Sequence, residues 1–141
     1  MGSGGVSDET GMYPAFDRDT EEMTSSDVFA VENLPSGSAM LLVQRGPDAG
    51  SRFLLDSDTV SVGRHPSSDI FLDDISVSRR HATFTRRTSG FVVADLGSLN
   101  GTYVNRDRID GEIALTGGDE VQIGKYRLIY FPAQVQKGSA R

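Results

Sequence analysis

The chain carries the sequences GRHP at residues 63–66, SRRH at residues 78–81 and GSLNGT at residues 97–102. Each polar block lies beside stretches in which apolar and polar residues alternate, which predicts loops at the ends of strands. Arginine offers a planar fork that meets phosphate oxygens with two hydrogen bonds, serine adds a hydroxyl, and asparagine can hold a peptide backbone. Three loops that bring these groups together predict a binding site for one phosphorylated residue.

The segments around these blocks predict an all-β domain, because short apolar or alternating runs are separated by turn residues. Candidate strands cover residues 39–45, 51–55, 59–62, 70–72, 81–87, 91–95, 103–104, 109–114, 120–123 and 126–131. No segment sustains the helical period of about 3.6 residues, so helices should be nearly absent. About 10–11 short strands predict a two-sheet β-sandwich whose loops gather at its ends. Alternation directs these side chains into the core: Leu42, Phe53, Leu55, Val62, Phe84, Val92, Leu115, Val121, Ile123, Leu128 and Tyr130.

The order of the three blocks resembles the forkhead-associated (FHA) domain, a module that binds phosphothreonine peptides and is not an enzyme. Arg64, at the end of a candidate strand, is predicted to bind the phosphate, and the resemblance adds Ser78 as a direct phosphate contact. It also implies that Asn100 holds the peptide backbone. Further peptide contacts that the resemblance implies are Arg79, Ser98 and Leu99, the last two toward residues C-terminal to the phosphothreonine. The residues that it implies structure the loops are Gly63, His81, Gly101 and Asn105.

Several alternatives compete for these residues. Arg64 could be an exposed arginine paired with Asp69 or Asp73, and Arg80 a solvated loop tip. Ser78, His81 and Asp95 could suggest a hydrolase, but the serine lacks the Gly-x-Ser-x-Gly elbow and no oxyanion loop is indicated. Gly124-Lys125 is not a phosphate-cradling P-loop, because no Ser or Thr follows, and is predicted to be a turn.

Composition narrows the function classes. The chain of 141 residues has no cysteine and two histidines, which predicts no metal site, and no cofactor is expected. No apolar run approaches the roughly 18 residues of a membrane helix and no signal region is evident, so we expect a cytoplasmic protein without a membrane partner. Residues 1–36 carry eight acids against one base, or −7, whereas residues 37–141 carry 12 acids and 13 bases, or +1. This balance argues against nucleic-acid binding.

The same asymmetry divides the chain. Residues 1–36 are predicted to be a disordered acidic regulatory tail, of which residues 1–5 look like a tag remnant, residues 37–131 form the FHA domain, and residues 132–141 form a flexible C-terminal tail. An acidic tail beside a near-neutral domain allows an intramolecular attraction; the alternative is that it only keeps the protein soluble.

Residues 36–131 are more specifically similar to actinobacterial FHA regulators of the GarA/OdhI type, in phrases such as AGSRFLLD at 49–56 and SDIFLDD at 68–74. The resemblance implies a regulator that, unphosphorylated, binds and inhibits the 2-oxoglutarate dehydrogenase complex and that also acts on glutamate-metabolising enzymes, and we expect it to be a monomer. It also implies that a Ser/Thr protein kinase phosphorylates a tail threonine, which then occupies the chain's own FHA site and excludes the enzymes. The alternative is a phosphothreonine-dependent adaptor that links a kinase to its substrates, with a passive tail.

The tail departs from the family pattern, which has Glu-Thr-Thr-Ser-Val-Phe where this chain has EMTSSDVF at residues 22–29. An ungapped match places Ser26 at the modified position and a gapped match places Thr24 there. FHA pockets also bind the threonine methyl group, so the predicted phosphorylation site is Thr24, with Thr20 as the second choice. The alternative is that neither residue is modified.

Overall fold

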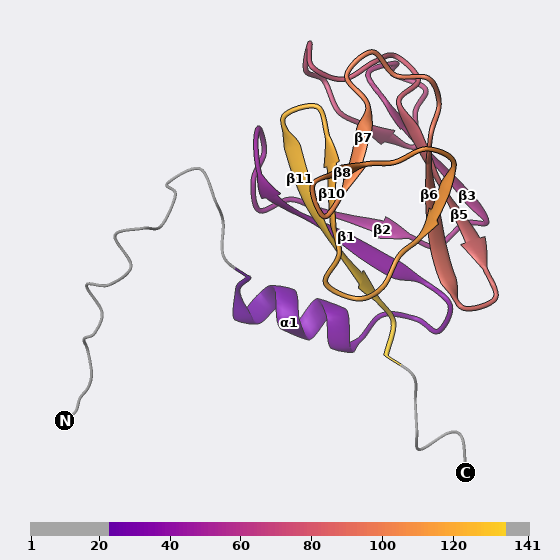
Figure 1. Cartoon of the computed structure of the whole chain (residues 1–141). Coiled ribbons are helices and arrows are strands. Elements are labelled where there is room, and N and C mark those ends of the chain that lie inside the picture. The colour runs from indigo at the N-terminus through magenta and orange to yellow at the C-terminus, as the bar shows by residue number, and fades with distance from the viewer. Residues whose placement is uncertain (1–22, 135–141) are drawn as a thin grey trace.

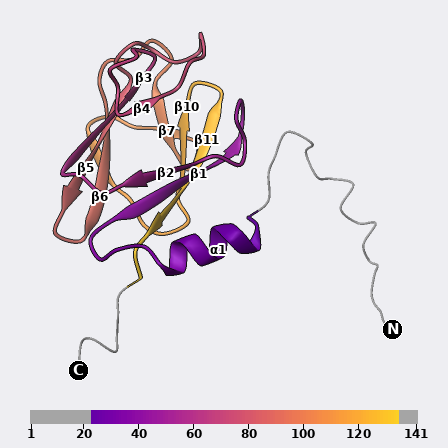
Figure 2. The ribbon, with the colours of Figure 1, turned by 180° about the vertical axis from the view of Figure 1, so that it is seen from behind.

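A computed structural model describes residues 23–134 as two packed β-sheets and one short helix (Figures 1 and 2). The first sheet has the order β2-β1-β11-β10-β7-β8, with bounds β1 Ala39–Arg45, β2 Arg52–Leu55, β7 Thr102–Val104, β8 Asp107–Arg108, β10 Glu120–Ile123 and β11 Tyr126–Pro132. The second has the order β4-β3-β5-β6-β9, with bounds β3 Thr59–Gly63, β4 Ile70–Phe71, β5 Ala82–Arg87, β6 Gly90–Asp95 and β9 Glu112–Ala114. The predicted all-β two-sheet sandwich is confirmed.

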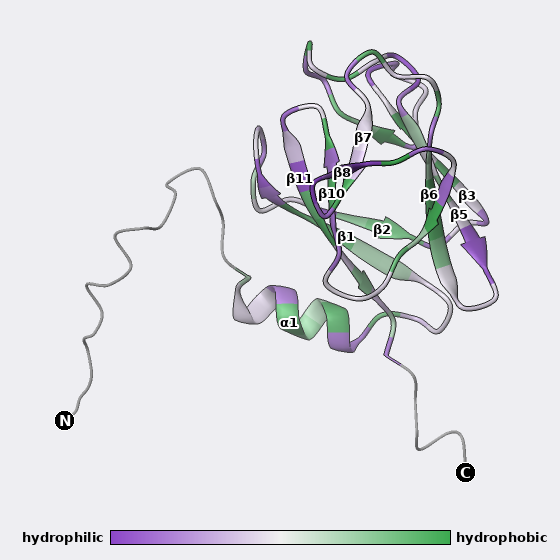
Figure 3. Ribbon diagram, in the orientation of Figure 1, coloured by the Kyte–Doolittle hydropathy of each residue, from purple (hydrophilic) through white to green (hydrophobic). Residues whose placement is uncertain are grey.

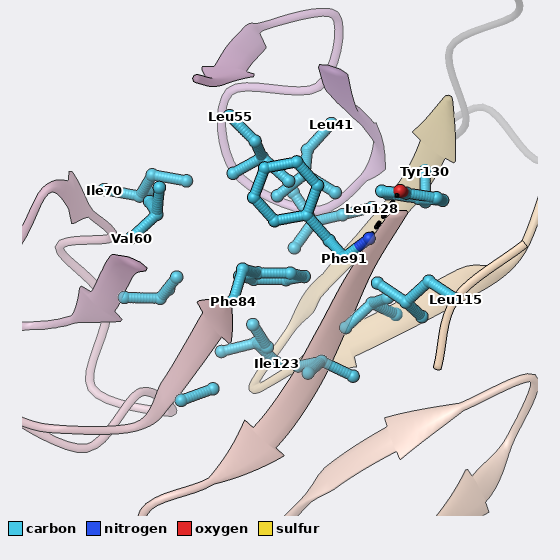
Figure 4. Close-up of a cluster of buried hydrophobic side chains, with 14 of the residues drawn as sticks. Leu41, Leu55, Val60, Ile70, Phe84, Phe91, Leu115, Ile123, Leu128 and Tyr130 are labelled. Atoms are coloured by element: carbon cyan, nitrogen blue, oxygen red, sulfur yellow. Dashed lines mark hydrogen bonds between the residues drawn. The ribbon is translucent and has the colours of Figure 1, made fainter. Parts of the chain in front are cut away.

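The core lies between the two sheets (Figure 4). Phe84 and Phe91 of the second sheet pack with Leu128 and Tyr130 of β11, and all four are at most 2% exposed. The Tyr130 hydroxyl enters this apolar layer and accepts the Phe91 amide proton at 3.1 Å, so the buried oxygen has a partner. Burial raises the pKa of Tyr130. This bond joins an end of β6 to β11 and ties the two sheets together.

Two strand predictions differ from the structure. In β6 the buried residues are Phe91 and Val93, whereas Val92, predicted to face the core, is only half-buried. The run FVVA at residues 91–94 contains no polar residue that would fix the phase of the alternation, so the prediction was wrong by one position. The strand predicted at 109–114 is present only over 112–114, as β9, because the preceding residues form a turn after β8 that includes Gly111 at φ +95°.

The helix α1, Ser25–Glu32, corrects the prediction that residues up to 36 have no regular structure. Thr24 caps it: the Thr24 hydroxyl accepts the Asp27 amide proton at 3.1 Å, and the Asp27 carboxylate accepts the Thr24 amide proton at 2.9 Å. Residues 1–22 and 135–141, including Thr20 and the candidate tag remnant, lie outside the described residues. No helix in the described part of the chain is long and apolar enough to cross a membrane.

Packing against the outer face of β1 explains why α1 is part of the fold. The five residues 39–43 of β1 are all buried, because Ala39, Leu41 and Val43 face the core whereas Met40 and Leu42 face outward, where Val31 of α1 covers them. Ala30, Leu34 and Phe131 complete this second, smaller cluster. Figure 3 shows hydrophobic residues along β1 and in the middle of α1. The predicted inward residue Leu42 is therefore buried, but on the outer face of its sheet.

Candidate functional site

The loops that connect β3 to β4, β4 to β5 and β6 to β7 gather at one end of the sandwich, uppermost in Figure 1. The Arg64 amide donates to the Ser78 carbonyl at 3.0 Å, and the His65 amide donates to the Arg79 carbonyl at 3.3 Å. These bonds hold the first two polar blocks side by side. Gly63 is needed there, because an added Cβ would overlap the Arg79 carbonyl oxygen. The close approach of two backbones thus explains the glycine of the first block.

His81 joins the second block to the third from inside the domain. It is 0% exposed; its Nδ1 accepts the Ser78 amide proton at 3.1 Å, and its Nε2 lies 2.9 Å from the Gly101 carbonyl oxygen. An amide donor at Nδ1 and a carbonyl acceptor at Nε2 require the neutral tautomer with its proton on Nε2. Burial lowers the pKa of His81, which favours this form. His81 is therefore bonded to both loops from the interior, and neither of its ring nitrogens faces the solvent.

Asp95 organises the third block, and sequence analysis did not assign it this role. Its carboxylate accepts the hydroxyl of Ser98 at 2.5 Å and that of Thr102 at 2.7 Å, and the Ser98 hydroxyl accepts the Gly101 amide proton at 2.9 Å. Burial by itself would raise the pKa of Asp95, but the hydrogen bonds from Ser98, Thr102 and Gly97 outweigh it and lower that pKa. Asp followed two residues later by Gly and three later by Ser is a turn signal that identifies such a role. Ser98 is buried, so its side chain holds the loop together and does not face a ligand.

Leu99 and Asn100 form the outer edge of the third block. The Leu99 amide donates to the Ser78 hydroxyl at 2.9 Å, and the Leu99 side chain is 84% exposed. The Asn100 Nδ2 donates to the Ser76 carbonyl at 3.0 Å, and the other atom of its carboxamide, Oδ1, has no hydrogen-bond partner within residues 23–134. The structure thus brings Ser78, Leu99 and Asn100 together and leaves one acceptor and one apolar side chain open.

Ser76 connects this edge to the β10–β11 turn, a link that the sequence did not predict. Its hydroxyl donates to Asp74 at 2.5 Å and accepts the Lys125 amide proton at 2.9 Å. Hydrogen bonds from the Ser76 hydroxyl and amide lower the pKa of Asp74, with a smaller contribution from the nearby Lys125 and Arg64 charges. Gly124 and Lys125 form a turn, as predicted. Four loops, rather than three, therefore share one hydrogen-bonded frame.

Three exposed arginines stand on this frame: Arg64, Arg79 and Arg80. The ion pairs among the described residues involve Arg52, Arg86, Arg87 and Arg127 but none of these three. The competing pairing of Arg64 with Asp69 is not formed, because the Asp69 carboxylate accepts the Ser61 amide and hydroxyl instead. Exposed guanidinium groups outside any ion pair are available to bind an anion such as a phosphate.

Asn105 lies at a different turn. It follows β7, at the other end of that strand from the third block, with φ +51°. Its Nδ2 donates to Asp119 at 3.1 Å, and its Oδ1 accepts the Glu120 amide proton at 3.0 Å. Asn105 therefore structures a loop, but that loop is the β7–β8 turn and not the polar blocks.

The geometry disfavours the hydrolase alternative. His81 bonds the backbone amide of Ser78 rather than its hydroxyl, and the Asp95 carboxylate bonds Ser98 and Thr102 rather than His81. A catalytic triad requires the histidine to receive the serine proton and the acid to orient the histidine. Within residues 23–134 there is also no cluster of three His, Asp or Glu side chains that could hold a metal ion.

The sandwich and its end loops define an FHA domain, and the FHA domain family model matches residues 60–124. A structure described as "Structural and functional analysis of phosphothreonine-dependent FHA domain interactions" is 28% identical, with a TM-score of 0.63 over 70% of this chain and 99% of that one. The structure of Mycobacterium tuberculosis EmbR in complex with a low-affinity phosphopeptide is 26% identical, with a TM-score of 0.64 over 79% of this chain and 30% of that one.

Curated relatives narrow the family. The chain is 64% identical over 107 residues to the glycogen accumulation regulator GarA of Mycolicibacterium smegmatis, which covers 76% of this chain and 67% of the relative. It is 62% identical over 99 residues to the oxoglutarate dehydrogenase inhibitor of Corynebacterium glutamicum, which covers 70% of this chain and 68% of the relative. The chain belongs to this family of actinobacterial FHA regulators. Its relatives are named as a regulator and an inhibitor, which confirms the prediction that the protein is not an enzyme.

Proposed function

We propose that the loop end of the sandwich binds phosphothreonine through Arg64 and Ser78, with Arg79 beside them and Asn100 on the peptide backbone. The observation that carries this proposal is the set of exposed arginines outside any ion pair of the described residues, on the hydrogen-bonded frame that also holds the Ser78 hydroxyl. The free Oδ1 of Asn100 can accept a peptide N–H while its Nδ2 stays on Ser76. The exposed Leu99 offers an apolar contact to residues C-terminal to the phosphothreonine.

The names of the relatives support a regulatory role. In this proposal the unphosphorylated protein is a cytoplasmic monomer that binds and inhibits the 2-oxoglutarate dehydrogenase complex, and glutamate-metabolising enzymes are further targets. A Ser/Thr kinase phosphorylates the tail at Thr24, or at Thr20, and the phosphothreonine then occupies the domain's own site. The enzymes are thereby excluded. A phosphothreonine adaptor with a passive tail is the competing proposal, and nothing in the described residues favours it.

The helix α1 adds a requirement to this switch at Thr24. Thr24 caps α1, and Asp27, the partner of the cap, lies 3.4 Å from Arg52 on β2. The helix lies at the end of the sandwich opposite the polar loops (Figures 1 and 2). A phosphothreonine at Thr24 can reach Arg64 only when α1 leaves the sheet. The 14 residues between Thr24 and Ala39 span about 50 Å when extended, which is enough to pass around a domain of this size.

The closed form remains favoured even when the free-energy cost of releasing α1 from the sheet is included. A short tether supplies a millimolar effective concentration, so a micromolar intrinsic affinity favours the closed form about 1,000-fold. A release cost of about 2 kcal/mol for α1 would reduce this ratio about 30-fold. The phosphorylated protein would still be closed in roughly 97% of molecules by these estimates.

The binding proposal is tested by titrating the unphosphorylated full chain with a peptide of residues 17–29 phosphorylated on Thr24. Replacing Arg64→Ala should weaken binding about 100-fold, because charge-assisted hydrogen bonds contribute roughly 1.5–3 kcal/mol each. Arg106→Ala, at the distant β7–β8 turn, is the matched control and should change affinity less than about twofold. Equal binding of the unphosphorylated peptide would contradict the proposal.

The regulatory proposal needs an enzyme assay. The unphosphorylated protein should inhibit the 2-oxoglutarate dehydrogenase complex, and the kinase-treated protein should not. Thr24→Val should preserve inhibition after kinase treatment if Thr24 is the site, whereas loss of inhibition in this variant would point to Thr20. The adaptor alternative predicts no inhibition by either form, so that result would overturn the regulatory proposal.

A further inference from the structure

A second polar pocket opens beside the proposed phosphothreonine site. It has a volume of about 270 Å³, and its lining includes His65, Ser67, Ser68 and Arg80. His65 and Arg80 directly follow Arg64 and Arg79 in the chain, and the backbone bonds of those two arginines hold the two loops together. The pocket is therefore adjacent to the residues proposed to bind the phosphate.

The polar groups of the pocket suit an anion. Arg80 has no ion-pair partner within residues 23–134, and the Ser68 hydroxyl has no hydrogen-bond partner among those residues, so it can donate to an anion. The His65 Nδ1 accepts the Ser67 amide proton at 3.0 Å and lies 2.6 Å from the Ser67 hydroxyl oxygen, so the Ser67 hydroxyl is used within the loop and the other ring nitrogen is free to donate. Asp69 is the nearest acid in sequence, and Ser61 already donates two hydrogen bonds to its carboxylate.

The pocket lies against the first two polar blocks through His65 and Arg80, and Leu96 of the β6–β7 loop also lines it. The Leu99 amide bonds the Ser78 hydroxyl from the third polar block, and Arg80 lies two residues after Ser78 in the second block. Arg80 directly follows Arg79, so the residues in front of a phosphothreonine bound at the proposed site are within reach of the pocket. The chemistry of the pocket should then be matched by the sequence in front of the phosphothreonine.

The chain's own tail supplies that match. The segment 17–22 has the sequence DRDTEE, in which four of six residues are acidic, and it directly precedes Met23 and Thr24. We propose that the pocket of His65, Ser67, Ser68 and Arg80 is an acidic-residue subsite that receives the carboxylates of this segment when the phosphothreonine is bound. This inference rests on the proposed phosphothreonine site and adds the preference for acidic residues N-terminal to it. The subsite would make the domain favour its own tail over ligands without such residues.

The test is a thermodynamic cycle on the full, unphosphorylated chain. One probe is the peptide of residues 17–29 with phosphate on Thr24, and the second has its acids neutralised by Asp17→Asn, Asp19→Asn, Glu21→Gln and Glu22→Gln. The wild-type protein should bind the acidic peptide about fivefold more tightly, the size expected for charge pairs in partial contact with water. Arg80→Gln should reduce this preference to less than about twofold without weakening binding of the neutral peptide.

Arg106→Gln is the matched control and should keep the full preference for the acidic peptide. Equal binding of both peptides by the wild-type protein would overturn the subsite and leave the phosphothreonine site intact. A preference that survives Arg80→Gln, or a loss of affinity that is the same for both peptides, would also overturn it. If neither phosphopeptide binds, the proposed phosphothreonine site fails, and the subsite fails with it.

Discussion

Replacing Val31 by aspartate should release α1 from the sheet while the sandwich stays folded. Val31 is 6% exposed and packs on Met40 and Leu42, in a cluster separate from the main core. Full burial of a valine contributes about 1.5–3 kcal/mol, and a carboxylate at this position adds a desolvation cost. The docked state should therefore lose a factor of about 10 to 150 relative to the released state.

Hydrogen exchange measures this change directly. The Val28 amide bonds the Thr24 carbonyl at 3.0 Å, so its exchange reports opening of the first turn of α1. In Val31→Asp the protection of α1 amides should fall at least about tenfold, and the rate of Thr24 phosphorylation by a Ser/Thr kinase should rise in parallel. Protection in β5 and β6 should change little, because those strands belong to the main core.

Val28→Asp supplies the matched control. Val28 is 41% exposed on the same helix, so the same substitution changes charge and helix propensity without removing the contact with the sheet. Its α1 amides should keep their protection within about twofold. Equal deprotection in both variants would refute the proposed role of the Val31 contact. Collapse of protection across β5 and β6 in Val31→Asp would show instead that α1 is an integral part of the core.

Two further outcomes follow from the loop frame. Burial holds the pKa of His81 below its ordinary value of 6.5, so the unfolded chain takes up a proton there first. The contribution of His81 to stability is complete above pH 6.5 and decreases as the pH falls below that value. The Tm should therefore be lower at pH 5.5 than at pH 7.5. An equal decrease of Tm in His81→Asn would assign the effect to other groups. Gly63→Ala should lower the free energy of unfolding by about 3 kcal/mol and abolish phosphopeptide binding, because the added Cβ would overlap the Arg79 backbone. Gly117→Ala is the control and should cost less than about 1 kcal/mol, because its Cβ meets only the side chain of Pro132. Equal Tm values for the two variants would contradict this reasoning.

The sequence predicted the strands and the polar blocks because both are local patterns. Alternation identified most strands, and the structure holds the three blocks together at one end of the sandwich. Alternation assigned the wrong side chain to the core in β6, at Val92, because no neighbouring polar residue shows which positions face outward. The helix was missed although residues 39–43 carried a signal for it. Five consecutive apolar residues in an antiparallel strand imply that both faces are buried, and the outer face needs a cover.

The supporting residues of the site were beyond local patterns. Ser76 bonds Lys125, 49 positions away in sequence, and His81 bonds Gly101, 20 positions away. Such partners become neighbours only when the sheets are assembled, so no spacing rule identifies them. For Ser98, in contrast, the local pattern gave an expectation that its side-chain contacts do not match. Its place in the block predicted a ligand contact, but the carboxylate of Asp95 turns its hydroxyl into the loop.

The proposed switch would give Thr24 two incompatible roles. As the cap of α1 its hydroxyl accepts the Asp27 amide proton, and as a ligand of the polar loops it would carry a phosphate on the same oxygen. A phosphate there would also stand beside the Asp27 carboxylate, which repels it. In the proposed switch, phosphorylation of Thr24 would therefore both disfavour the docked state, through repulsion by Asp27, and create the ligand for the polar loops. The populations of the two states depend on their difference in free energy. The contact of Val31 with the sheet stabilises the docked state, so it determines how tightly the loops must bind phosphothreonine for the closed state to predominate.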